Sequence, residues 1–357
     1  MSALKLSLAM IAKNEARCLA RCLRSVRNLA DEIIVADTGS TDDTVKIARE
    51  NGATVAPYAW TNDFAAARNF ALAQATGDWV LVLDADEWAG ETLAGEIRKF
   101  IAGPLRIGRL KIVSDFRHHG QTQRSSTFVS RLFPRGATFV GRIHEQIVSP
   151  LPRVNLPGEL WHDGYLETRK TDRNVKMLAA EIAREPQNAY LHFQLALEFT
   201  SLGQPQNAFA CLQKARAVMQ PSDPFAPNVI VDFLYAALEL NEFAAGLEAI
   251  RAAENRLADF PDFHHVCGLF YMKFIGSNPA KHIAELPKIE QSFRRSLALG
   301  ETDKYKSVHG SGSFLANYNL GVFYHAFGDH ARARECLWAA AAQNYAPAAA
   351  LLEKLPA

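Results

Sequence analysis

The first ninety residues alternate short apolar runs with segments of helical periodicity, and no other feature constrains the fold as much. The apolar runs cover residues 6–12, 32–37, 54–58 and 79–83. Runs of this length and composition are typical of strands buried on both faces of a sheet. Strands that alternate with helices form right-handed βαβ units, so we expect an α/β domain with a mostly parallel, Rossmann-like sheet.

Acidic residues follow two of these predicted strands. Asp37 ends the second run, and Asp84 comes directly after the fourth. Ligands of open parallel sheets bind beyond the carboxyl ends of the strands. The topology therefore predicts that both carboxylates lie at the ligand edge of the sheet.

The most informative local motif is Asp84-Ala85-Asp86, with Glu87 beside it. Two carboxylates two residues apart can share one divalent cation, and Mg²⁺ and Mn²⁺ favour oxygen ligands. Such a cation would neutralise a diphosphate leaving group. The triplet also occurs by chance in structural turns, but its position after a buried strand favours the functional interpretation.

Two further loops carry polar residues that suit a nucleotide. Residues 37–42 contain a helix cap, and Asp37, upstream of the cap, can accept a bond from the imide N–H of a uracil. Arg68 and Asn69 follow a helix start at residues 62–63, and arginine offers a fixed fork of donors to a diphosphate. Capping and surface packing are the structural alternatives for these residues.

Residues 107–148 have a different pattern. Segments such as 109–113 and 130–133 alternate apolar with polar residues, and Gly and Pro punctuate them. This pattern predicts β-hairpins added to the parallel core.

Four motifs in order resemble glycosyltransferase family 2, which has the GT-A fold. They are residues 10–15, 35–42, 63–69 and 83–87, and the resemblance covers residues 5–170. The subgroup that it resembles most contains lipopolysaccharide-core glucosyltransferases of the bacterial cell envelope and bacteriocin S-glycosyltransferases. Members of this subgroup often carry C-terminal tetratricopeptide-like helices.

The resemblance implies an inverting, metal-dependent transfer of a hexose from a UDP-sugar. Asn14 and Glu15 would lie beside the nucleoside, and Asp37 would meet the base. Arg68 and Asn69 would contact the base or the diphosphate. These residues would form most of the nucleotide-sugar site.

The metal ligands and the remaining donor contacts are also implied by the resemblance. Asp86 would bind Mn²⁺ or Mg²⁺ directly, Asp84 would serve the ribose or the metal, and Ala85 would lie beside the nucleotide-sugar. His162 would reach the metal or the diphosphate, or else only satisfy a domain junction.

Inversion requires a base that deprotonates the acceptor as it attacks the anomeric carbon. Residues 141–145 resemble the second conserved stretch of the subgroup, where family members carry this base, and Glu145 is our choice. Glu87 or a more distant acid competes for the role. His144 would orient the base or line the acceptor site.

Beyond about residue 170, Ala, Leu and aromatic residues recur at helical spacing. The helix pairs cover residues 188–218, 228–257, 262–299 and 315–343. The first and last pairs match the tetratricopeptide pattern of about 34 residues. We therefore predict a GT-A domain over residues 1–168 and an all-α tetratricopeptide-like domain over residues 169–357.

Bulk properties restrict the partners. The formal net charge of +1 provides no global field that would hold nucleic acid. The five cysteines suit buried thiols in a reducing compartment. No signal peptide and no apolar run of roughly 18–20 residues are found, so we expect a cytoplasmic protein whose membrane contact, if any, is peripheral.

Two hypotheses about function remain open. The first is an active enzyme that glycosylates a saccharide, a lipid-linked glycan or a peptide. The second is a scaffold protein whose front domain only binds a nucleotide-sugar while the repeats recruit a protein partner. The intact acidic motif favours the enzyme. The repeats would form a homodimer, present a concave surface to a peptide or protein acceptor, or only pack on the catalytic domain.

Overall fold

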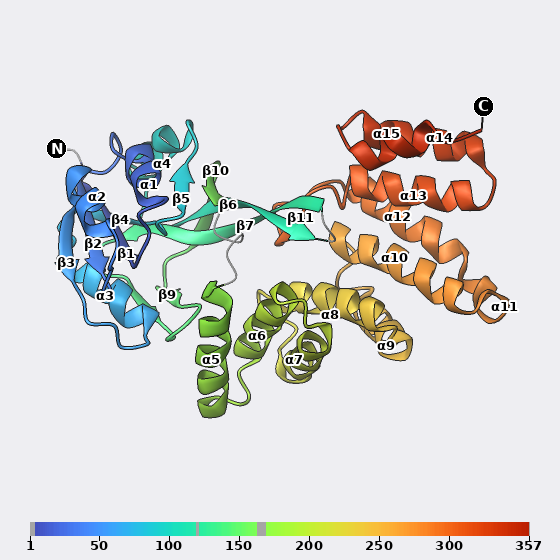
Figure 1. Cartoon of the computed structure of the whole chain (residues 1–357), viewed down its shortest axis with the longest axis horizontal. Helices are drawn as coiled ribbons and strands as arrows, with labels where there is room; N and C mark the ends of the chain where they lie inside the picture. Colours follow the sequence, from blue (N-terminus) through green and yellow to red (C-terminus); the bar gives the residue numbers. More distant parts are fainter. Residues whose placement is uncertain (1–3, 119–120, 163–168, 357) are drawn as a thin grey trace. The chain divides into compact units, whose positions relative to one another are not determined.

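The computed structural model describes residues 4–118, 121–162 and 169–356. The chain divides into two compact units, Met1–Met177 and Leu178–Ala357. Figure 1 shows the sheet of the first unit in blue to green and the helices of the second in yellow-green to red. An α/β sheet domain followed by an all-α domain is thus confirmed as the fold class. The domain boundary expected after residue 168 stays a prediction.

A mixed sheet forms the centre of the N-terminal unit. Its strands are β1 (Leu6–Ala12), β2 (Glu32–Asp37), β3 (Thr54–Pro57), β4 (Trp79–Val82), β5 (Glu87–Ala89), β6 (Ile107–His118), β7 (Gln121–Pro134) and β10 (Arg153–His162). They lie in the order β3-β2-β1-β4-β7-β6-β10-β5. The pairs β1–β2, β1–β4 and β2–β3 are parallel, so the four apolar runs form the predicted parallel part.

The antiparallel part of the sheet comes from the segment with the alternating pattern. Strands β6 and β7 form a long hairpin, and β7 also pairs with β4. The expectation of hairpins added to a parallel core is therefore confirmed. A second hairpin, β8 (Thr138–Val140) with β9 (Gln146–Val148), forms a separate two-stranded sheet.

Helices cover both faces of the main sheet. On one face, α1 (Leu19–Ser25), α2 (Thr44–Glu50) and α4 (Leu93–Ile101) pack on strand residues such as Leu8 and Leu81. On the other face, α3 (Phe64–Gln74) and the β8–β9 hairpin pack on Ala9 and Val82. Successive strand side chains point to opposite faces, which explains why each apolar run feeds two cores.

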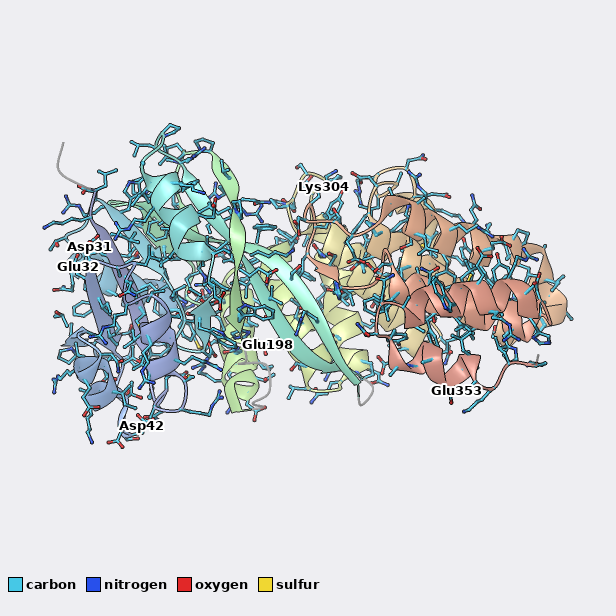
Figure 2. The ribbon with its side chains drawn as sticks, turned by 90° about the horizontal axis from the view of Figure 1, so that it is seen from above. Asp31, Glu32, Asp42, Glu198, Lys304 and Glu353 are labelled. Atoms are coloured by element: carbon cyan, nitrogen blue, oxygen red, sulfur yellow. The ribbon has the colours of Figure 1, made fainter. Side chains whose placement is uncertain are left out.

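Two acids fasten the amino ends of the parallel strands. Asp31 accepts a hydrogen bond from the Leu6 N–H (2.7 Å), and Glu32 accepts one from the Thr76 N–H (2.6 Å). Figure 2 labels both acids, and Asp42, which follows the carboxyl end of β2, lies apart from them. The ligand edge is the opposite edge of the sheet, so these two acids are structural.

The second unit is an array of antiparallel helix pairs. It contains α6 (Ala189–Ser201), α7 (Pro205–Val218), α8 (Ala226–Leu240), α9 (Phe243–Ala253), α10 (Pro261–Ser277), α11 (Pro279–His282), the 3₁₀ turn η2 (Ile283–Glu285), α12 (Pro287–Leu299), the short strand β11 (Ser307–Val308), α13 (Phe314–Ala326), α14 (His330–Ala341) and α15 (Ala346–Leu352), and α5 (Arg169–Arg184) leads into it. The predicted pairs are present. Only the third is interrupted, because Pro279 and the Asn278 cap start the short α11.

Small residues set the distance between neighbouring helices. A Cβ atom added to Gly268 in α10 would lie 2.6 Å from the ring of Phe293 in α12. A Cβ atom added to Gly321 in α13 would lie 2.7 Å from Leu337 in α14. These glycines let the helices approach more closely than any larger residue would, which is the function of small residues in such repeats.

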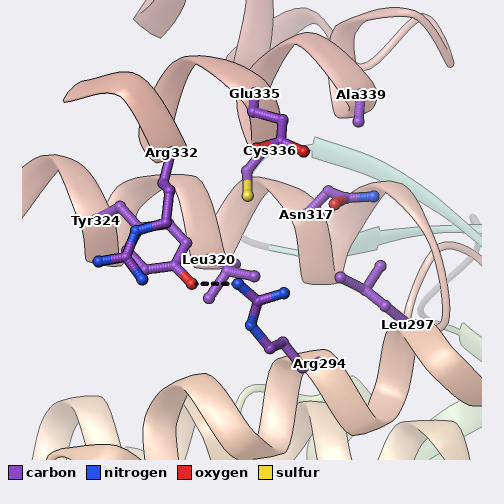
Figure 3. Close-up of a pocket in the computed structure, with 9 residues that line it drawn as sticks. All are labelled: Arg294, Leu297, Asn317, Leu320, Tyr324, Arg332, Glu335, Cys336 and Ala339. Atoms are coloured by element: carbon purple, nitrogen blue, oxygen red, sulfur yellow. Dashed lines mark hydrogen bonds between the residues drawn. The ribbon is translucent and has the colours of Figure 1, made fainter. Parts of the chain in front are cut away.

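A pocket of about 160 Å³ opens among α12, α13 and α14 (Figure 3). It is lined by Arg294, Leu297, Asn317, Leu320, Tyr324, Arg332, Glu335, Cys336 and Ala339. Arg294 pairs with Glu290 (2.7 Å) and donates to the Tyr324 hydroxyl (2.9 Å), and Arg332 pairs with Asp329 (2.6 Å). Cofactor sites usually occupy roughly 300–1,000 Å³, so this pocket is too small for a nucleotide-sugar.

A buried polar network fixes the long connection between α12 and α13. Asp262 in α10 is buried, and it accepts hydrogen bonds from the Val308 N–H (2.8 Å) and from the Ser311 hydroxyl. Burial raises the pKa of Asp262 more than these two hydrogen bonds lower it. Together with the nearby charge of Glu301, burial brings this pKa to about 7. Burial lowers the pKa of the neighbouring His265 to about 4.

Within the described part of the chain, no helix is both long and apolar enough to cross a membrane.

Two glycines of α10 provide a matched test of the packing. We expect Gly268→Ala to destabilise the protein by about 1–3 kcal/mol, because the new methyl group overpacks against Phe293. Gly276→Ala is the control, since nothing lies within 4 Å of its added Cβ, and it should stabilise the helix by up to about 1 kcal/mol. Chemical denaturation measures both values, and equal effects of the two substitutions would contradict this account.

The titration of Asp262 predicts a dependence of stability on pH. The pKa of Asp262 is about 7 in the folded protein, which is higher than in the unfolded chain. Protonation of Asp262 therefore stabilises the folded state. This stabilisation is complete below about pH 4 and is lost as pH rises to 7. Asp262→Asn removes it. Between pH 5 and 8 the stability of the variant should therefore rise relative to wild type by on the order of 2 kcal/mol.

The control for this measurement is Asp259→Asn. Asp259 binds the same connection through Lys304 and Tyr305, and the hydrogen bond from Lys304 lowers its pKa. Its titration therefore falls below pH 5, and the offset of this variant from wild type should stay constant between pH 5 and 8. A constant offset for Asp262→Asn as well would show that Asp262 does not carry the effect.

Candidate functional site

The loops after β1 and β2 are tied together at the ligand edge. Asn14 has a left-handed backbone (φ 56°), and its N–H donates to the Ser40 hydroxyl (3.0 Å). The Asn14 side-chain oxygen accepts from the Thr41 N–H (2.8 Å), and the Glu15 N–H donates to the Thr44 hydroxyl (2.7 Å). Asn14 and Glu15 thus join the loops after β1 and β2, and their position beside a nucleoside stays a prediction.

Asp37 closes its own loop at the end of β2. Its carboxylate accepts hydrogen bonds from the N–H groups of Gly39 (3.3 Å) and Ser40 (3.2 Å), and Gly39 takes the positive φ of 100° that this turn needs. The start of α2 has no capping bond from its N-cap residue Asp43, but Asp42 accepts a hydrogen bond from the Thr44 N–H (3.0 Å). A carboxylate has about four acceptor positions, so Asp37 can still accept an N–H from a ligand.

Four acids and two arginines meet beyond the carboxyl end of β4. Arg68 of α3 donates to Asp84 (2.7 Å) and to Glu145. One nitrogen of Arg131, from β7, donates to both Asp84 (2.7 Å) and Glu87 (2.5 Å). The acid that follows Ala85, Asp86, belongs to the same turn.

The acids differ in their access to solvent. The Asp84 side chain is 35% exposed, whereas that of Glu87 is only 2% exposed. The second Glu87 oxygen accepts the Asp84 N–H (2.9 Å), so both of its oxygens are engaged inside the protein. This position suits a structural carboxylate better than a base that must reach an acceptor.

The two guanidinium groups control the charge of the cluster. Loss of water around Asp84 opposes its ionisation, but the charges of Arg131 and Arg68 outweigh this and hold the pKa of Asp84 well below its usual range. Burial raises the pKa of Glu87 in spite of Arg131. The pKa values of both arginines rise because the acids stabilise their charged forms more than burial disfavours them.

His162 at the end of β10 faces Asp86. Its Nε2 atom lies 3.6 Å from a carboxylate oxygen of Asp86, and its Nδ1 atom lies 3.2 Å from the Ser114 hydroxyl. Burial lowers the pKa of His162, but Asp86 more than compensates and the net shift is upward. Among the described residues, no three His, Cys, Asp or Glu side chains gather in an arrangement that holds an ion.

Glu145 lies on the loop between β8 and β9, and its partner is Arg68. The loop turns sharply at Gly141 (φ 90°) and at His144 (φ 52°). Its start is fastened to α3, because the Phe64 N–H donates to the Arg142 carbonyl (2.8 Å). The cap of α3, Asp63, accepts from the Ala66 N–H (2.8 Å), as the sequence predicted for residues 62–63.

Asn69 binds the protein itself. Its side-chain amide donates to the Phe139 carbonyl (2.9 Å), and its oxygen accepts the Phe139 N–H (2.8 Å). In the structure this amide therefore holds β8 against α3. A contact of Asn69 with the donor, which the resemblance implies, stays a prediction.

Arg131 is the residue that the sequence analysis did not select. It lies in the alternating segment 130–133, which was interpreted only as hairpin. The available signal was a charged side chain directly before the apolar pair Leu132-Phe133, in a segment predicted to add to the core sheet. The structure shows that this arginine is 10% exposed and bound to two of the acids.

Comparison with known proteins supports the assignment of the first unit. Residues 7–150 match the sequence profile described as Glycosyl transferase family 2. The N-terminal unit is a family 2 glycosyltransferase domain. All candidate residues except His162 lie within the matched range of this glycosyltransferase domain.

Several relatives contain similar sequences. The TPR repeat-containing protein Synpcc7942_0270 of Synechococcus elongatus is 34% identical over 263 residues, which cover 69% of this chain and 64% of that protein. The SPbeta prophage-derived glycosyltransferase SunS of Bacillus subtilis is 30% identical over 221 residues, which cover 58% of this chain and 52% of SunS. The chain thus spans less than two thirds of the length of either relative. The helices of the second unit are tetratricopeptide-like.

Solved structures give weaker matches. Glucosyl-3-phosphoglycerate synthase from Mycobacterium tuberculosis, in complex with Mn²⁺, UDP and glucosyl-3-phosphoglycerate, is 25% identical with a TM-score of 0.27, over 33% of this chain and 46% of that one. MamA is 16% identical with a TM-score of 0.39, over 50% of this chain and 91% of MamA. The assignment of the glycosyltransferase domain therefore rests on the sequence matches.

The structural role of Asn69 can be tested by replacing its side-chain NH₂ group with an oxygen. Asn69→Asp keeps an oxygen for the Phe139 N–H but loses the donor to the Phe139 carbonyl, which costs roughly 1–3 kcal/mol when the group is left unpaired. We expect faster amide hydrogen exchange over residues 138–148. Asn62→Asp is the control, because its oxygen only accepts from Trp60. Unchanged exchange in Asn69→Asp would contradict the structural role.

Proposed function

We propose that this chain is an inverting, metal-dependent glycosyltransferase that moves a hexose from a UDP-sugar to a saccharide, a lipid-linked glycan or a peptide. The observation that carries the proposal is the acidic cluster at the ligand edge of a family 2 glycosyltransferase domain, with the Asp84 side chain 35% exposed and Asp86 facing His162. Acids at the carboxyl ends of parallel strands are placed where ligands of such sheets bind.

Two side chains of the cluster are of the kinds that bind divalent cations. A carboxylate oxygen of Asp86 and the His162 imidazole lie 3.6 Å apart, and both groups are common metal ligands. These two residues would hold Mn²⁺ or Mg²⁺, with Asp84 as a further oxygen ligand or a ribose contact. The ion would neutralise the charge of the departing diphosphate.

Arg68 is suited to bind the diphosphate. Its Nη1 atom is buried and has no hydrogen-bond partner among the described residues, while its other nitrogens hold Asp84 and Glu145. A buried donor without a partner is costly, and an anionic ligand would remove that cost. Asn14, Glu15 and Asp37 would line the nucleoside end of the same edge.

Glu145 is our choice for the base. It would take the proton from the acceptor hydroxyl or thiol while the acceptor lone pair forms the bond to the anomeric carbon. The bond from that carbon to the UDP oxygen breaks on the opposite face, and UDP leaves with the electron pair. Arg68 keeps the Glu145 carboxylate in place. His144, its neighbour, would orient the base or line the acceptor site.

The test is a turnover assay with UDP-glucose, UDP-galactose and UDP-N-acetylhexosamines in the presence of Mn²⁺ or Mg²⁺. We expect Asp86→Ala to lose metal-dependent UDP binding. Glu145→Gln should keep donor binding but lose transfer by on the order of 10²–10⁴-fold, which is the usual contribution of a general base. Glu50→Gln, at the exposed end of α2, is the control for loss of an acid.

Unchanged transfer in both Asp86→Ala and Glu145→Gln would show that the site is assigned wrongly. Tight UDP binding by the wild type without turnover on any acceptor would favour the alternative, a nucleotide-sugar-binding scaffold whose repeats recruit a protein partner. A homodimer formed through the repeats is a separate prediction. It is tested by measuring the molecular mass of the protein in solution, which should be twice that of one chain.

A further inference from the structure

Arg131 lies outside the residues that the family 2 motifs mark, yet it makes the central contacts of the cluster. It comes from β7, an antiparallel strand next to β4. Its Nη2 atom bonds Asp84 (2.7 Å) and Glu87 (2.5 Å) at the same time. One nitrogen thus joins two carboxylates that are three residues apart in the chain.

The acids need this arrangement for an electrostatic reason. Asp84, Asp86 and Glu87 stand within four residues, and Glu145 is joined to them through Arg68. Like charges at such distances repel, and a buried carboxylate without a partner is strongly unfavourable. Without Arg131, the buried Glu87 would lose its countercharge and Asp84 would keep only Arg68.

Arg131 also distinguishes the acids from one another. Asp84 and Glu87 are bonded to its guanidinium, whereas Asp86 faces His162 on β10. The guanidinium fixes the turn on both sides of Asp86 while it leaves the Asp86 carboxylate pointing to the imidazole. The orientation of the acid that would bind the cation therefore depends on a residue that does not touch the cation.

We propose that Arg131 is a positioning residue of the donor site, which binds Asp84 and Glu87 so that Asp86 and His162 are held ready for a divalent cation. This inference rests on the proposed function. Residues that orient metal ligands typically change metal affinity by 10–100-fold when they are removed. The role of Arg131 should therefore be visible in the metal requirement of UDP binding.

The experiment measures UDP binding to the full chain by calorimetry across a series of Mn²⁺ concentrations. In Arg131→Met, the Mn²⁺ concentration for half-maximal UDP binding should rise by about tenfold or more. UDP affinity at saturating Mn²⁺ should stay within about threefold of wild type, because the nucleotide contacts remain. Arg131→Lys should recover part of the loss, because a single nitrogen makes both bonds.

Because Arg131→Met leaves Glu87 unpaired, we expect its melting temperature to fall by about 10 °C. The double variant Arg131→Met/Glu87→Gln removes that buried charge and should recover most of the melting temperature. The Mn²⁺ concentration that the double variant requires should stay raised, since Asp84 still lacks its bond to Arg131. Arg109→Met on β6 is the matched control, because Arg109 donates to the Phe128 carbonyl (2.8 Å) and should leave the Mn²⁺ requirement unchanged.

The outcomes separate the two proposals. A wild-type chain that binds no UDP with any Mn²⁺ concentration overturns the proposed function. A wild type that binds UDP, with an unchanged Mn²⁺ requirement in Arg131→Met, overturns only the positioning role. Recovery of both stability and Mn²⁺ requirement in the double variant also overturns it, because Arg131 would then be merely structural.

Discussion

Two buried guanidinium groups hold three carboxylates in one place, and the candidate site depends on these ion pairs. Arg68 joins Asp84 to Glu145, and Arg131 joins Asp84 to Glu87. Acids this close would otherwise repel, and buried charges are stable only when they are paired. The pairs explain why α3, β7 and the loop after β8 converge on the end of β4.

The order of the strands makes this convergence geometrically natural. Strand β7 runs antiparallel beside β4, with Leu81 opposite Leu132, so the next step along the register brings Arg131 beside Val82, the last residue of β4. Strand β10 reaches the same edge from farther along the sheet, and its pairing with β5 sets His162 opposite Glu87. Strands β7 and β10 thus complete, at the ligand edge, a site that β1, β2 and β4 begin.

The helical unit achieves its stability by a different arrangement. Its helices approach through glycines such as Gly268 and Gly321, where any Cβ would collide with a neighbour. The buried imidazole of His265 is held by hydrogen bonds with Tyr235 and Asn319. Here burial shifts pKa values toward the neutral forms, whereas the ion pairs of the first unit hold Asp84 and both arginines charged.

The sequence by itself determined the parts of this protein that depend on local pattern. Continuous apolar runs predicted the parallel strands, alternating residues predicted the hairpins, and helical periodicity predicted the helix pairs, because each pattern reflects which sides of an element are buried. The position of Asp37 and Asp84 at strand ends placed both at the ligand edge. The tertiary structure alone decided which acids are buried, which arginines pair with them, and that Asn69 binds Phe139. Arg131 meets Asp84 across 47 residues of chain, and such a contact is set by strand pairing, which no local pattern encodes.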